Sequence, residues 1–132
     1  MSNINRRTAM LTAGAAPVAL LAGTAGALPA QPSADPLPSL VARYMAATDA
    51  LIAAANEPGG GNFDTPACLA AAGEREALCE PIARAIPTTP EAAVAQLEWL
   101  DRDSEGMDLG YPLYIVAIRN CAAGLRAMEA LA

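Results

Sequence analysis

The chain has 132 residues, of which 14 are acidic and 8 are basic, giving a net charge of −6. No nucleic-acid partner is expected, because binding to phosphates needs a basic surface that this composition does not supply. All basic residues are arginines, and a chain without histidine or lysine lacks the usual base at neutral pH, the Schiff-base amine and the commonest metal ligands. We therefore expect no catalytic residues, no cofactor and no enzymatic activity.

Alanine occupies 33 positions, with few aromatic and only scattered β-branched residues beside it. This composition favours helices and offers little from which to build strands. The predicted fold class is all-α: a small helical bundle or helical hairpin of about four helices, preceded by a signal peptide and a proline-rich tether.

Residues 1–27 have the three-part pattern of a secretory signal peptide. Arg6 and Arg7 lie in a short polar start, a weakly hydrophobic run follows, and Ala25 and Ala27 place small residues in the cleavage region. The paired arginines resemble those of twin-arginine leaders, although Ala9 stands where that class favours phenylalanine. We expect a protein of the periplasm or a secreted protein, which meets the membrane only transiently through this leader.

Residues 28–38 hold four prolines and are predicted to form a tether, and residues 39–132 the all-helical domain. The first helix should run from about residue 38 to residue 56, with Val41, Tyr44 and Ala47 on its apolar stripe. The glycines at 59–61 should end it.

A second helix is expected to begin at Pro66, capped by Asp64 or Thr65. Pro81 should bend this helix or split it in two, because proline removes a backbone donor and clashes with the preceding turn. The residues predicted to share one stripe are Cys68, Ala72, Arg75, Cys79, Ile82 and Ile86.

Thr89, Pro90 and Glu91 form the clearest helix start, since they supply a cap, a suitable first residue and a charge that complements the helix dipole. The predicted apolar face of this third helix consists of Ala93, Val94, Leu97 and either Leu100 or Asp101. Trp99 then falls at the edge of the bundle, or alternatively against a partner.

The fourth helix is predicted from about residue 112 to residue 131. Its first half is apolar on all sides, so the segment from Tyr111 to Ile118 is either centrally buried or a surface for self-association. The stripe predicted along this helix consists of Tyr114, Ile118, Cys121, Leu125 and Met128.

Export would place the three cysteines in an oxidising compartment, where one disulfide could form. Cys68 and Cys79 are eleven residues apart, or about 16 Å along one helix, which is too far for a bridge. A disulfide would therefore join Cys121 to Cys79 or Cys68. The alternative is three small buried thiols.

The segment 101–108 between the last two helices contains Asp101, Asp103 and Glu105, followed by glycine, as in the first half of a helix-loop-helix calcium site. The pattern then fails, because Pro112 stands where that site has a bidentate glutamate. These three residues are a weak candidate for a metal site, and the alternative is a solvated acidic turn.

The leader and the segment PTTPEAAVAQLEWL resemble a loose group of small, alanine-rich helical bacterial proteins that carry a twin-arginine signal and have no known function. The resemblance supplies no site residues. We expect an exported, non-enzymatic interaction protein or structural accessory, with a protein partner or self-association. The alternatives are a calcium-responsive binding module that uses residues 101–108, and a phage or mobile-element protein that stays in the cytoplasm.

Overall fold

The computed structural model describes residues 34–132. Its helices are α2 (Leu37–Ala55), α3 (Pro66–Arg84), α4 (Pro90–Asp103) and α5 (Pro112–Leu131). Residues 34–132 contain no strand, so the predicted all-α fold is confirmed. The predicted leader, with Arg6, Arg7, Ala25 and Ala27, lies outside the described residues.

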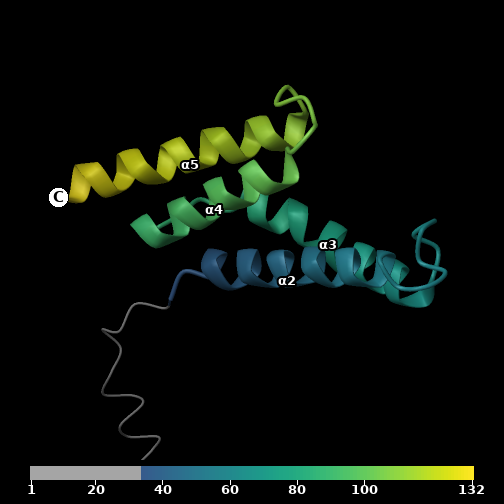
Figure 1. The fold of residues 1–132 in the computed structure, drawn as a ribbon. Coiled ribbons are helices and arrows are strands. Elements are labelled where there is room, and N and C mark those ends of the chain that lie inside the picture. Colours follow the sequence, from purple (N-terminus) through teal and green to yellow (C-terminus); the bar gives the residue numbers. More distant parts are fainter. Residues whose placement is uncertain (1–33) are drawn as a thin grey trace, which may run out of the picture. The chain divides into compact units, whose positions relative to one another are not determined.

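The helices form two helical hairpins, α2 with α3 and α4 with α5 (Figure 1). Helix α4 contacts the three others, α3 also contacts α2 and α5, and α2 lies apart from α5. In the described part of the chain, no helix is both long enough and apolar enough to cross a membrane.

The structure confirms the predicted starts of α3 and α4. The hydroxyl of Thr65 accepts a hydrogen bond from the Cys68 N–H at 3.3 Å, and that of Thr89 accepts one from the Ala92 N–H at 3.1 Å. Pro66 and Pro90 each follow the cap directly, where the missing proline N–H costs nothing.

The first described helix starts slightly before the predicted domain boundary at residue 39. Asp35 joins the fold, because its carboxylate accepts hydrogen bonds from the Leu37 N–H and from both the N–H and the hydroxyl of Thr88. Leu37 is fully buried. The end of the predicted tether is therefore part of the packed structure, held by the connection between α3 and α4.

Pro81 does not split α3, which runs unbroken from Pro66 to Arg84. The proline lies in the last turns, where side chains from other helices satisfy the backbone. The Gln96 amide donates to the carbonyls of Ile82 and Ala85, and the Asn120 amide to those of Ala83 and Arg84. These tertiary bonds satisfy the last carbonyls of the helix, whereas Pro81 removes the N–H that would bond to the Ala77 carbonyl one turn earlier. Ile86, predicted on the helix stripe, lies beyond the helix end and is exposed.

The inward face of α4 differs in part from the predicted one, since Ala93 is buried and Leu100 is packed against the core as predicted. Ala92, Gln96 and Trp99 point inward, whereas Val94 and Leu97 are 54% and 46% exposed. The prediction followed the branched aliphatic residues, but an indole buries far more apolar area than either side chain. Packing therefore selects the register that buries Trp99, and both the edge position and the partner contact predicted for this residue are wrong.

The buried face of α5 is likewise made partly of small residues. Ile118 and Leu125, predicted on the inner stripe, are about half exposed. Gly124 allows close packing, since a Cβ there would lie 2.3 Å from the Pro87 carbonyl oxygen. The inner face consists of Tyr114, Ala117, Cys121 and Gly124.

Candidate functional site

The main polar feature of the interior is a group of side chains around Asp103, which we call the Asp103 cluster. The Tyr44 hydroxyl donates to Asp103 Oδ1 at 2.6 Å, and the Tyr114 hydroxyl lies 2.7 Å from Oδ2. Arg75 lies 3.1 Å from Oδ1 and also donates from Nε to the Tyr44 hydroxyl at 3.0 Å. The cluster thus joins one residue from each of α2, α3 and α5 to a single carboxylate on α4.

Cys79 completes the Asp103 cluster. Its sulfur lies 3.4 Å from the Arg75 carbonyl oxygen and 3.7 Å from Asp103 Oδ1. Burial, reinforced by the negative charge of Asp103, raises the pKa of this thiol to about 11, against a smaller opposing effect of Arg75. The thiol is therefore protonated at neutral pH and is a poor nucleophile.

The two tyrosines of the cluster are held protonated in the same way. Burial and the hydrogen bond to Asp103 raise the pKa of Tyr44 to about 12, and the same two causes raise the pKa of Tyr114. Burial tends to lower the pKa of Arg75, but its bond to Tyr44 and the Asp103 charge outweigh this effect and raise it. At neutral pH the two tyrosines and the thiol of the cluster are thus neutral, and Arg75 is charged.

Aromatic rings surround this cluster. The Trp99 ring packs edge-on against Tyr44 and Tyr114, with centroids 6.4 and 6.0 Å apart, and the Arg75 guanidinium lies 5.3 Å from the Tyr44 ring centroid. Such contacts add to area burial and restrict the side-chain rotamers. The arrangement is suited to holding four helices in register.

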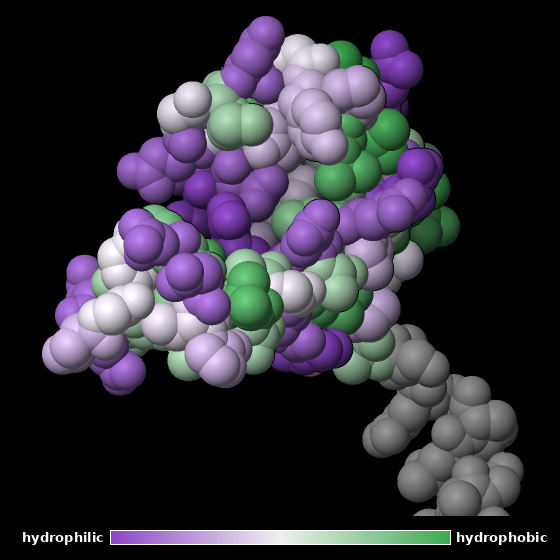
Figure 2. Space-filling model, turned by 90° about the vertical axis from the view of Figure 1, so that its right-hand side faces the viewer, coloured by the Kyte–Doolittle hydropathy of each residue, from purple (hydrophilic) through white to green (hydrophobic). Residues whose placement is uncertain are grey.

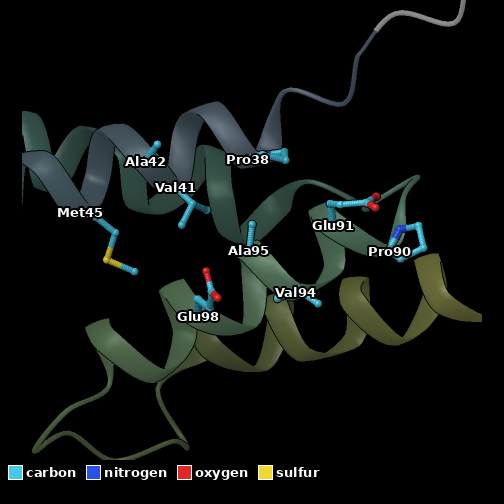
Figure 3. A pocket seen from close by; sticks show the side chains of 9 residues that line it. All are labelled: Pro38, Val41, Ala42, Met45, Pro90, Glu91, Val94, Ala95 and Glu98. Atoms are coloured by element: carbon cyan, nitrogen blue, oxygen red, sulfur yellow. The ribbon is translucent and has the colours of Figure 1, made fainter.

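A second feature is a groove between α2 and α4, with a volume of about 490 Å³. Figure 3 shows Val41 and Met45 extending from α2, and Ala95 and Glu98 extending from α4, toward the space between the helices. The groove is lined by Pro38, Val41, Ala42 and Met45 of α2 and by Pro90, Glu91, Val94, Ala95 and Glu98 of α4. Its lining is mostly apolar, with two carboxylates.

Hydrophobic residues also reach the surface elsewhere. Figure 2 views the molecule from the end that holds the connections of both hairpins, and hydrophobic residues gather in one part of this surface while polar residues cover most of the rest. In the predicted self-association segment, Tyr111 and Ile118 are exposed, whereas Tyr114 is buried in the Asp103 cluster.

The three weak metal candidates do not converge. Asp103 is turned into the cluster, Asp101 is exposed, and exposed Glu105 lies 3.8 Å from Arg102. Within residues 34–132, no three His, Cys, Asp or Glu side chains are grouped to hold a metal ion. The structure therefore does not assemble the calcium site considered for residues 101–108.

The cysteines are free thiols in three different places. Cys68 lies against the Gly60 carbonyl, Cys79 in the Asp103 cluster and Cys121 against the Ala93 carbonyl. The disulfide considered between Cys121 and Cys79 or Cys68 is not formed in this structure. Each sulfur instead occupies a buried or half-buried packing position.

The Asp103 cluster itself was not predicted from the sequence. Helical periodicity places Tyr44 and Arg75 on apolar stripes, and the acidic pattern of residues 101–108 marks Asp103 only as a candidate calcium ligand. The available signal was a polar atom on each of these inward-facing residues, because a buried polar group needs a hydrogen-bond partner. Comparisons of this chain with protein-family models, with curated proteins and with solved structures found no significant match.

Proposed function

We propose that this chain is an exported, non-enzymatic protein that acts by binding another polypeptide along the groove between α2 and α4. The observation that carries the proposal is Val94, an exposed aliphatic side chain that lines the groove together with the apolar residues Val41 and Met45. A groove between two helices is a common binding site for the apolar face of an amphipathic helix.

The Asp103 cluster supports this role indirectly. It fixes the positions of α2 and α4, because Tyr44 of α2 and Asp103 of α4 are joined directly. A groove with rigid walls loses less conformational entropy when a partner binds. The cluster is therefore the part of the interior that keeps the groove in shape.

The binding role is tested by the size of the native complex in extracts of the cells that make the protein. Val94→Asp should shift the protein from a larger complex to the monomer, whereas Leu69→Asp on α3 should not. The two side chains are comparably exposed, at 54% and 61%. A protein that is monomeric in the extract, or complexes lost equally in both variants, would contradict the proposal.

Export is proposed from the pattern of residues 1–27 and is tested separately. Fractionation should find the protein outside the cytoplasm, with an N-terminus close to Leu28 by mass. An intact Met1 or Ser2 terminus in the cytoplasmic fraction would contradict export and would favour the cytoplasmic alternative.

A further inference from the structure

The groove between α2 and α4 has a distinct charge pattern. Glu91 and Glu98 are exposed, lie seven residues apart on α4, and belong to no ion pair within residues 34–132. Seven residues are two helical turns, so the carboxylates recur on one side of α4 at about 10.5 Å. No basic residue lines the groove. The pattern fits a helix with cations at the same interval.

Helix α5 of the same chain carries the complementary pattern. Arg119 and Arg126 are seven residues apart, exposed, and unpaired among the described residues. Each follows a half-exposed aliphatic residue, Ile118 and Leu125. The aliphatic pair and the arginine pair therefore form two adjacent rows with the two-turn interval of the groove carboxylates.

The position of α5 makes this face accessible. Gly124 packs on Pro87, just before α4 begins, so the residues from Leu125 onward extend past the first turn of α4. Figure 1 shows the C-terminal end of α5 projecting beyond α4. Leu125 and Leu131 are exposed there. This end holds one arginine, Arg126, and one carboxylate, Glu129, whereas Arg119 precedes Gly124.

We propose that the occupant of the α2–α4 groove is α5 of a second copy of this chain. Ile118 and Leu125 of one copy pack on Val41, Met45 and Val94 of the next, and Arg119 and Arg126 pair with Glu98 and Glu91. This inference rests on the proposed function and names its partner. Each copy carries both contacting surfaces, so reciprocal insertion gives a two-fold dimer, whereas one-way insertion gives rings or open chains.

The net negative charge of the protein opposes this contact and weakens it. Outside the predicted leader, the chain has six arginines and 14 acidic residues, which give a net charge of −8 per copy. Copies therefore repel one another except where the arginine row meets the glutamate row. The groove is lined by nine residues, fewer than the roughly 20–30 residues per side of a stable interface, so the association is expected to be weak.

The test is sedimentation velocity over a concentration series, with the protein purified from cells and its terminus established by mass. The wild-type average mass should rise above the monomer with concentration. Glu91→Arg/Glu98→Arg and Arg119→Glu/Arg126→Glu should each weaken association at least tenfold. Combining all four substitutions restores opposite charges across the contact and should restore association.

A matched control is Glu57→Arg/Glu76→Arg, two exposed carboxylates away from the groove that form no ion pair in the described part of the chain. It reduces the net negative charge as much as the groove variant does, and it should leave association unchanged or stronger. Circular dichroism should show that each variant retains its helices.

Two results would overturn the inference: a wild-type protein that remains monomeric up to about 1 mM, or association that persists in the groove variant. If the purified protein is monomeric while the complex in cell extracts still depends on Val94, the partner is a different chain. The proposed function would then stand without this inference.

Discussion

Replacing Asp103 with asparagine tests whether the Asp103 cluster holds the helices together. The substitution keeps the shape of the side chain but removes the charge that Tyr44, Arg75 and Tyr114 share. Removing one partner of a buried ion pair costs about 3–5 kcal/mol, and the partial exposure of Arg75 (34%) calls for a lower value. The substitution also removes a negative charge from the C-terminal end of α4, where the helix dipole disfavours it, and this recovers about 0.5 kcal/mol of stability. We expect a net loss of about 2 kcal/mol in the free energy of unfolding.

The assay is urea unfolding followed by the fluorescence of Trp99, which is buried against both cluster tyrosines. A loss of about 2 kcal/mol lowers the melting temperature of a domain of this size by roughly 8–16 °C. The control is Asp101→Asn, because Asp101 is an exposed carboxylate near the same helix end. If Asp103→Asn unfolds within about 0.5 kcal/mol of the wild type, the range typical of neutral surface substitutions, the role assigned to the cluster is refuted.

Three further predictions concern stability. The pKa values of Tyr44 and Tyr114 are higher in the folded protein than the ordinary tyrosine pKa of 10.0. The protonated tyrosines therefore contribute their full stabilisation at pH values below 10.0. This stabilisation should fall as the pH rises from 10 toward 12, and the fall in urea-unfolding stability should be smaller in Tyr44→Phe. Thr89→Ala removes the α4 cap and should cost about 1 kcal/mol in thermal or urea unfolding; an unchanged midpoint would contradict the capping role. Gly124→Ala inserts a methyl group against Pro87 and should destabilise by about 1–3 kcal/mol, whereas alanine at the open Gly73 should not destabilise the protein.

The parts of the fold that were predicted correctly depend on neighbouring residues. The Thr89 hydroxyl caps α4 by accepting a hydrogen bond from the N–H three residues later, and Pro90 fixes the backbone angle of the first helical residue. The glycine turn after α2 is equally local, since Gly59 adopts the left-handed conformation that favours glycine. Such features are readable from a short stretch of sequence.

The register of α4 and the Asp103 cluster depend on distant residues. Tyr44 and Asp103 are 59 positions apart, and Arg75 and Asp103 are 28 positions apart. Helical periodicity cannot show which inward-facing polar atoms will meet. It also failed to rank Trp99 above Val94, because a count of apolar positions takes no account of the area that each side chain buries.

The same register accounts for the proposed binding surface. Because Trp99 faces inward, Val94 and Leu97 face outward, and Glu91 and Glu98 lie beside the α2–α4 groove. The exposed aliphatic residues are therefore a consequence of how the core packs. We propose that the protein uses this surface for association.

The most direct test of the central claim is photo-cross-linking in the producing cells from a reactive residue placed at Ala42, in the groove. Ala70 on the exposed side of α3 serves as the control position. Binding of α5 in the groove of a second copy should give a single major adduct from Ala42, with the mass of two copies of this chain and with peptides of α5 at the cross-link. The same adducts from both positions, or none from Ala42, would contradict it.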